Sequence, residues 1–171
     1  LENTIVMFSS DHGEMLGSHG LEGKNVIQLE SIAIPFIVHW PKGLKAGVSE
    51  VLFSAPDVLP TAMGLAGLEK HIPSDIQGIN FAKSLANSND KEIKEPKSAL
   101  LMLAHARGVY THRYTLCLTE NKHPKEGTPD LQESFLYDNL KDPYQLKKIA
   151  LSEHPKIAKN LLSHLGLHLK K

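Results

Sequence analysis

The chain of 171 residues carries nineteen Lys and Arg residues and nineteen Asp and Glu residues, so its formal net charge is zero when the histidines are neutral. This balance leaves no excess of positive charge to attract nucleic acid or an anionic membrane surface, so neither is expected as a partner. No apolar stretch approaches the roughly 18–20 residues that a membrane-spanning helix needs, and no signal peptide is visible. The length suits about one to one and a half domains, and it is enough to form a hydrophobic core.

A short apolar run near the start of the chain predicts a buried strand. Residues 5–8 are β-branched, aromatic or long apolar residues, and they end at the polar cluster 9–13. Open α/β sheets bind their ligands at the carboxyl ends of their strands. Asp11 and His12, followed by a glycine that lets the backbone turn, therefore form a candidate metal corner. The alternative is that Asp11 only caps the helix or turn that follows.

The loop that continues to Lys24 is too polar and too rich in glycine to belong to a core. A long loop of this kind after a buried strand is more often functional than idle. Its polar and charged residues include His12, Glu14, Ser18, His19, Glu22 and Lys24, and they are interleaved with four glycines.

The next segments predict short elements that pack behind this loop. We expect a short helix or turn at 26–31, a second strand at 33–40, a buried helix within 55–67 and one helical turn at 81–85. Pro60 suits the first turn of the buried helix, and Gly67 suits its end. Pro35 places the second strand near a sheet edge, or lies at the beginning of that strand.

The polar segment 87–98 is the expected linker between residues 1–86 and a small antiparallel α+β subdomain at 99–171. Strands are predicted at 99–104, 108–111, 113–119 and 134–139, with a hairpin turn at Thr111-His112. A helix is expected at 145–150. A second helix is expected from Pro155 to residue 165, ending at Gly166 and packing on the sheet through its leucines.

Cys117 is the single cysteine and lies in a run of alternating, strand-like character. One cysteine cannot form an internal disulfide, so it leaves the redox compartment undetermined. We interpret it as a buried structural thiol, because free cysteine behaves as a small hydrophobic residue.

The loop and the segments after it carry an ordered set of residues that is far more specific than one short motif. These residues are Ser10-Asp11-His12-Gly13-Glu14-Met15-Leu16-Gly17-Ser18-His19-Gly20, Gly23-Lys24, Glu30-Ser31-Ile32, Ile34-Pro35-Phe36-Ile37-Val38, Pro56-Asp57-Val58-Leu59-Pro60-Thr61, Gly67-Leu68 and Leu136-Tyr137-Asp138-Asn139-Leu140-Lys141-Asp142-Pro143-Tyr144-Gln145-Leu146. The set resembles the sulfatase family of the alkaline-phosphatase-like superfamily. It covers nearly the whole chain but only the carboxyl-terminal part of the family's catalytic unit.

The resemblance implies an α/β to α+β fold: the carboxyl-terminal part of an alkaline-phosphatase-like sheet, then a small antiparallel sheet with a packed carboxyl-terminal helix. We therefore expect a fragment whose natural amino terminus lies far upstream. Residues 1–86 would be the end of the catalytic α/β domain. The intact parent would be a sulfuric ester hydrolase in a periplasmic, secreted or lysosomal type of compartment.

The resemblance also assigns roles around the metal corner. Asp11 lies where the family uses an aspartate to bind calcium, and a carboxylate suits a hard cation. His12 occupies a neighbouring family position that is often Asn but is His in a subset of sulfatases. Imidazole is a softer ligand than Ca²⁺ usually takes, so the divalent metal's identity stays open. The alternative for His12 is a purely local hydrogen bond.

Further roles concern the anion and the leaving group. Lys24 falls where the family's sulfate-contacting lysine lies, which makes it a catalytic and substrate-binding candidate; the alternative is an idle exposed lysine. His19 could protonate a leaving alcohol, or could equally make a substrate or structural contact. Arg107 and His112 either reach the substrate cleft or are ordinary sheet-edge residues. Glu14 and Glu22 receive no role.

Two family features are missing from this sequence. The family's nucleophile is a cysteine in a Cys-x-Pro-x-Arg type signature that is oxidised to formylglycine, whereas Leu118, Thr119 and Glu120 follow Cys117. The upstream aspartate pair of the family's metal site is also absent. Asp11 and His12 alone would bind a cation weakly, because an ion such as Ca²⁺ takes six or more oxygen ligands. We therefore predict that the fragment alone is inactive, and that formylglycine comes from the missing amino-terminal part of the same protein.

The implied substrate is a sulfated small molecule or carbohydrate. One alternative is a phosphoesterase or phosphonate hydrolase of the same superfamily, but the spacing of Lys24 and the Tyr137-Asp138 segment favour a sulfatase. The other alternative is a non-catalytic structural or interaction module that kept the fold without the chemistry.

Overall fold

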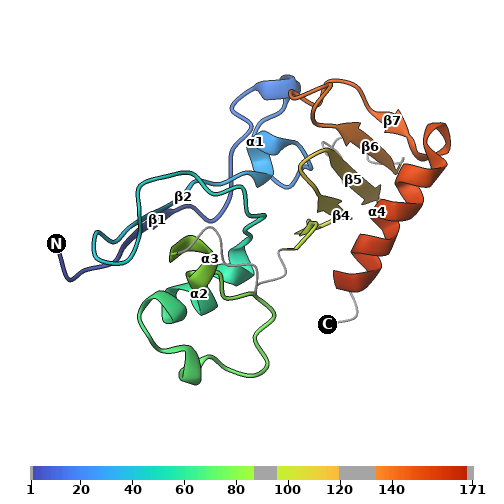
Figure 1. The fold of residues 1–171 in the computed structure, drawn as a ribbon. Coiled ribbons are helices and arrows are strands. Elements are labelled where there is room, and N and C mark those ends of the chain that lie inside the picture. The colour runs from blue at the N-terminus through green and yellow to red at the C-terminus, as the bar shows by residue number, and fades with distance from the viewer. Residues whose placement is uncertain (1, 87–95, 120–133, 169–171) are drawn as a thin grey trace. The chain divides into compact units, whose positions relative to one another are not determined.

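The computed structural model describes residues 2–86, 96–119 and 134–168 (Figure 1). These residues divide into two compact units. The first unit comprises the described residues within Leu1–Asp11 and Ile34–Pro96, and the second comprises those within His12–Ala33 and Lys97–Lys171. Each unit is described by itself below.

The first unit holds a two-stranded antiparallel sheet of β1 (Val6–Ser9) and β2 (Phe36–His39). Its helices are α2 (Val58–Leu65) and α3 (Ala82–Ala86), with 3₁₀ turns at Ala55–Asp57 and Glu69–His71. Strands are present at both expected places, 5–8 and 33–40, and the helices expected within 55–67 and at 81–85 are confirmed. The expected burial of the first strand is wrong, because β1 is mostly exposed in this two-stranded sheet and Phe8 is 61% exposed. Gly67 takes a φ of 75° just after α2, which is the left-handed conformation that a helix-ending glycine supplies.

Buried polar groups hold α2 in place within this unit. Asp57 is 5% exposed, and its carboxylate accepts the backbone N–H of Ser54 at 2.8 Å and of Ile79 at 2.7 Å. Thr61 Oγ1 accepts the N–H of Phe81 at 3.0 Å. Each contact satisfies a backbone N–H that would be costly to bury without a partner. The contacts of Ile79 and Phe81 also hold the segment after α2 against this helix.

The second unit is built on a five-stranded antiparallel sheet in the order β3-β4-β5-β6-β7. The strands are β3 (Ala99–Met102), β4 (Ala106–Tyr110), β5 (Tyr114–Thr119), β6 (Phe135–Asp138) and β7 (Ile149–Ala150). The predicted antiparallel subdomain and its hairpin are confirmed. In the hairpin, Thr111 N–H donates to Tyr114 O at 2.8 Å and Tyr114 N–H donates to Thr111 Oγ1 at 2.8 Å.

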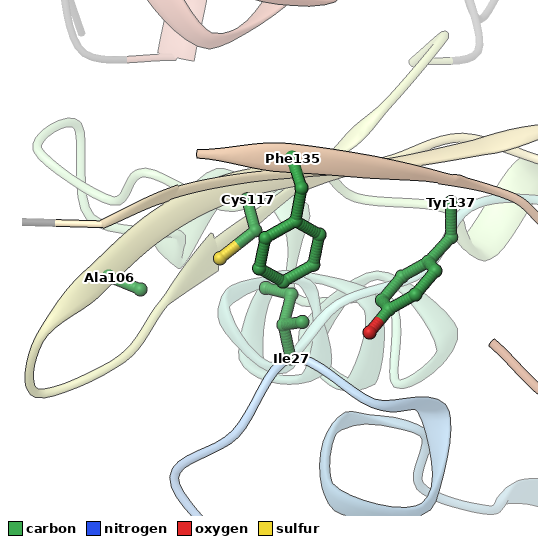
Figure 2. Close-up of a cluster of buried hydrophobic side chains, with 5 residues drawn as sticks. All are labelled: Ile27, Ala106, Cys117, Phe135 and Tyr137. Carbon is green, nitrogen blue, oxygen red and sulfur yellow. The ribbon is translucent and has the colours of Figure 1, made fainter. Parts of the chain in front are cut away.

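Both faces of this sheet are covered. On one face lies α4 (Pro155–His168) (Figure 1). Its Leu161 and Leu165 form a cluster with Val109 and Leu116. On the other face, Ile27 lies against Ala106, Cys117, Phe135 and Tyr137, as Figure 2 shows. Leu116 and Cys117 are neighbours in β5, and they point to opposite faces because side chains alternate along a strand.

Residues 12–33 therefore belong to the layer that covers the second sheet. This segment contains a 3₁₀ turn at Ser18–Gly20 and α1 (Leu29–Ile32), which matches the short helix or turn expected at 26–31. The sequence-based boundaries instead assigned the whole of 1–86 to one domain. Most of the expected linker at 87–98 lies outside the described residues.

One expected helix is absent, and the end of another is wrong. The helix expected at 145–150 is absent, because Gln145 has a φ of 53° and Ile149–Ala150 pairs with β6 as β7. The Asp142 carboxylate accepts the N–H groups of Leu146 and Lys147 at 3.0 and 2.7 Å, which closes a turn there instead. The last helix also continues past Gly166 to His168, whose Nε2 lies 3.0 Å from Ser98 Oγ. A 3₁₀ turn at Leu151–Glu153 precedes it.

Within the described residues, no helix is both long and apolar enough to cross a bilayer.

Candidate functional site

The polar loop that begins at His12 is closed upon itself by backbone contacts within the second unit. Gly13 N–H donates to Ser31 O at 2.9 Å, and Met15 N–H donates to Gly23 O at 2.9 Å. Met15 is 2% exposed and anchors the loop. A Cβ at Gly13 would lie 2.0 Å from Glu30 O, so only glycine allows the loop to approach α1 this closely.

Inside the loop, the imidazole of His12 and the ammonium of Lys24 come together. Lys24 Nζ contacts His12 Nε2, and His12 Nδ1 lies 2.7 Å from Gly13 O. A carbonyl can only accept, so Nδ1 carries the proton and donates to Gly13 O. Nε2 then holds the lone pair and accepts from the lysine ammonium. The sequence pattern predicted both residues as site residues, and the structure places their polar ends in contact.

The hydrogen bond from Nδ1 to a backbone carbonyl is the arrangement that metal-ligating histidines commonly use, because it fixes the tautomer and orients the other nitrogen. His12 thus makes a local hydrogen bond, as the alternative interpretation held. In this structure the Nε2 lone pair accepts from the Lys24 ammonium, so ligation of a metal by His12 stays a prediction.

Asp11 is exposed and directly precedes His12, at the end of the segment that carries β1. A carboxylate and a neutral imidazole are two donors that suit a divalent cation. Across the described residues, no group of three or more His, Cys, Asp or Glu side chains could hold a metal ion. The residues present therefore fit a part of a metal site, and a cation would need further ligands.

His19 lies in the 3₁₀ turn Ser18–Gly20. It has a φ of 56°, its side chain is 13% exposed, and its Nε2 lies 3.6 Å from Glu30 Oε1. The same oxygen accepts a hydrogen bond of 2.5 Å from Ser18 Oγ. The pKa of Glu30 is lowered chiefly by that hydrogen bond, with a smaller contribution from the charge of His19. These contacts join the loop to α1, which is the structural option among the roles expected for His19.

The other charged candidates lie at the hairpins or on the surface. Arg107 Nη1 donates to Leu103 O at 3.0 Å and so braces the turn between β3 and β4. His112 is exposed in the turn between β4 and β5. Glu14 and Glu22 are exposed in the polar loop.

A buried amide network behind α1 was not predicted from the sequence. Leu29 N–H donates to Gln145 Oε1 at 2.9 Å, while Gln145 Nε2 donates to Thr115 Oγ1 and Asn139 Oδ1, both at 3.1 Å. Gln145 is 1% exposed. Its only sequence signal is its place in the Leu136–Leu146 segment that carried part of the family resemblance.

Cys117 is buried in β5 and is excluded as a nucleophile in the folded chain. Burial raises the pKa of its thiol to about 11, which keeps it protonated near neutral pH. The expectation of a structural thiol is confirmed.

Comparisons with known proteins agree with this fold and loop. A family model described as sulfatase matches residues 1–68. An endo-4-O-sulfatase of Bacteroides thetaiotaomicron is 37% identical over 99% of this chain and 36% of its own length. A solved structure from work on the metabolism of multiple glycosaminoglycans by Bacteroides thetaiotaomicron superimposes with a TM-score of 0.87 at 37% identity, over 99% of this chain and 37% of that one.

A second solved structure, in complex with its substrate D-glucosamine-2-N,6-O-disulfate, superimposes with a TM-score of 0.84 at 30% identity, over 99% of this chain and 35% of that one. The chain belongs to the sulfatase family, whose members have the alkaline-phosphatase-like fold, and it corresponds to a carboxyl-terminal portion. It spans about a third of the length of the relative and the two solved structures named above.

Proposed function

We propose that this chain is the part of a sulfatase that supplies an anion-binding lysine and two metal ligands for the hydrolysis of sulfate esters. The observation that carries this proposal is the convergence of Lys24 Nζ on His12 Nε2, in a loop fixed to a packed sheet. An ammonium beside an oriented imidazole lone pair suits a site where a tetrahedral anion meets a cation.

Each residue then has a distinct task. Lys24 would hold a sulfate oxygen as a point charge and neutralise the charge that grows as the ester bond breaks. Asp11 would ligate a divalent metal, for which calcium is the family's expected ion. His12 Nε2 would join Asp11 as a ligand only when Lys24 no longer donates to that nitrogen. A divalent metal bound there would supply positive charge that stabilises the negative charge of the reacting sulfate group. The formylglycine nucleophile and the other metal ligands would come from a part of the protein outside this chain.

The substrate class proposed is a sulfated carbohydrate. The support comes from relatives whose names include an endo-4-O-sulfatase, an N-acetylglucosamine-6-O-sulfatase and a Δ4,5-hexuronate-2-O-sulfatase, all of Bacteroides thetaiotaomicron. These names share the sulfate ester on a sugar but differ in the position of the ester. The proposal therefore extends to the sulfated sugar and not to a particular ester position.

The rest of the same protein is the proposed partner of the first unit. Phe8 and Ile37 are directly paired across β1 and β2, and they are 61% and 60% exposed. An exposed pair of large apolar side chains on a two-stranded sheet indicates a surface that is covered in the complete molecule. The chain's coverage of about a third of its relatives leaves ample sequence to cover it.

The test is sulfate release by the full-length protein from which this chain derives. The protein is incubated with a set of sulfated mono- and disaccharides and with the matching phosphate esters, and the inorganic sulfate and phosphate released are quantified by ion chromatography. We expect release of sulfate with a preference over phosphate, and loss of that release in the Lys24→Met variant. Preferential release of phosphate would make the protein a phosphoesterase. Release of neither ion would support a non-catalytic module.

A further inference from the structure

Gln145 joins the candidate site loop to the sheet of the second unit. Its amide oxygen accepts the backbone N–H of Leu29 at 2.9 Å. Leu29 is the first residue of α1, where a backbone N–H has no partner inside the helix. Gln28, which precedes it, makes no side-chain cap, so Gln145 provides this cap from elsewhere in the chain.

The other end of the same amide is held by the sheet. Gln145 Nε2 donates to Thr115 Oγ1 on β5 and to Asn139 Oδ1, and Thr115 Oγ1 itself donates to Asn139 Oδ1 at 3.0 Å. Thr115 is fully buried, and Asn139 is 8% exposed. A satisfied polar network at this depth has one well-defined arrangement, because each unpaired member would be costly.

The contact to α1 leads directly to the site residues. Glu30 and Ser31 follow Leu29, and Ser31 O accepts the N–H of Gly13, while Glu30 O lies where a side chain at Gly13 would be. Gly13 O in turn accepts the Nδ1 proton that orients His12. A displacement of α1 would therefore move Gly13, whose carbonyl fixes the tautomer of His12. It would also move His12, which Lys24 contacts.

We propose that Gln145 is a positioning residue: through the N–H of Leu29 it holds α1, and thereby the loop that presents His12 and Lys24. This inference rests on the proposed sulfatase function for its catalytic consequence, but the positioning itself is measurable without activity. The inference assigns the carboxyl-terminal sheet a part in the geometry of the site.

The variants that test it separate the two ends of the amide in the full-length protein. Gln145→Met keeps the length of the side chain and removes both ends. Thr115→Val keeps the volume of the side chain and removes the hydroxyl that accepts from Gln145 Nε2. The contact between Gln145 Oε1 and the N–H of Leu29 remains. Gln145→Glu keeps an oxygen for Leu29 and loses the donor to the sheet. Backbone amide exchange, the melting temperature and the steady-state kcat and KM are measured for each variant.

For Gln145→Met we expect exchange of the Leu29 and Gly13 amides to rise about tenfold or more, and KM for the sulfated substrate to rise several-fold. For Thr115→Val we expect a lower melting temperature with Leu29 exchange and KM within about twofold of the parent. Gln145→Glu should keep the Leu29 amide protected and restore KM. Equal effects of Gln145→Met and Thr115→Val on exchange and KM would reduce Gln145 to an ordinary core residue and overturn the proposal.

Two further outcomes are also decisive. If Gln145→Met does not fold, the comparison of Gln145→Glu with Thr115→Val takes its place, and faster Leu29 exchange in Gln145→Glu than in Thr115→Val overturns the proposal. If the unmodified protein releases no sulfate, the proposed function fails. The exchange rates of Leu29 and Gly13 then still decide whether Gln145 positions the loop.

Discussion

The side chain of Gln145 accepts the backbone N–H of Leu29, although the two residues are 116 positions apart in the chain. This contact links the start of α1 to a turn beside the carboxyl-terminal sheet. Ile27, two residues earlier, adds an apolar contact to the same sheet. The polar loop with His12 and Lys24 is thus supported by residues at the opposite end of the sequence.

The first prediction concerns the apolar half of this support. Ile27 is 1% exposed and packs on Phe135 and Cys117, so Ile27→Ala should lower the free energy of unfolding by about 2–5 kcal/mol, the usual range for a buried large-to-alanine change. Urea unfolding of the full-length protein measures it. The matched control is Leu167→Ala, because Leu167 is 64% exposed and its loss should cost less than about 0.5 kcal/mol. Similar losses in both variants would contradict the packing of Ile27.

The second prediction concerns Gly13. A methyl group there would lie 2.0 Å from the carbonyl oxygen of Glu30, so Gly13→Ala must move the loop away from α1. We expect sulfate release to fall by roughly tenfold or more, because a shift of about 1 Å at a site costs that much or more. Gly47→Ala is the control, since a Cβ at Gly47 meets nothing within 4 Å and its φ is not positive. Unchanged activity in Gly13→Ala would refute the close approach.

The sequence predicted the local elements well and their partners poorly. The antiparallel strands from residue 99 onward and the hairpin at Thr111 follow from alternation and turn chemistry, and the structure contains them. The grouping of residues 12–33 with that sheet depends on Ile27 lying against residues about 80 to 110 positions later. No pattern of local periodicity carries that information.

The secondary-structure predictions that were wrong are at positions where a contact distant in the sequence decides the backbone conformation. Gln145 suits a helix by propensity, but its side chain is engaged by Leu29, Thr115 and Asn139, so its backbone takes a left-handed conformation. Gly166 suits a helix end, yet the helix continues two residues further, to where His168 contacts Ser98. In both cases a specific side-chain contact outweighs a preference of a few tenths to one kcal/mol.

Site residues could be predicted where one loop carried them together. His12 and Lys24 are twelve residues apart in the same loop, and the structure brings their nitrogens into contact. The partner of His19 was less accessible to sequence reasoning, because Glu30 lies beyond the loop, at α1. The stretch from Asp11 to Lys24 thus identifies the loop, but not what supports it.

The third prediction concerns Lys24 as the anion-binding residue. Lys24→Met removes the charge and keeps most of the length of the side chain, so kcat/KM for a sulfated sugar should fall by roughly 10²-fold, as when one donor to a charged transition state is lost. Lys24→Arg should retain part of the rate, because a guanidinium still carries the charge. Lys141→Met is the control, since Lys141 is also exposed in the second unit but is outside the loop. Equal kcat/KM for the parent and Lys24→Met would exclude the assignment.

The fourth prediction is a loss of stability at alkaline pH that originates in the cluster of Figure 2. Burial raises the pKa of Cys117 from 9.0 to about 11. Burial also raises the pKa of Tyr137 from 10.0 to about 12, with a further contribution from the charge of Cys117. Each group binds its proton more tightly in the folded state than in the unfolded state. The resulting stabilisation is complete below about pH 9 and is lost as the pH rises from there to about 12.

Urea unfolding of the full-length protein at pH 8, 10 and 11 measures this loss. The free energy of unfolding should be level up to about pH 9 and should then decline. The double variant Cys117→Ala with Tyr137→Phe should flatten that decline, because neither replacement titrates. Tyr144→Phe serves as the control, since Tyr144 is 73% exposed and should leave the decline unchanged. A decline of the same slope in the double variant would place its origin outside the cluster that Ile27 covers.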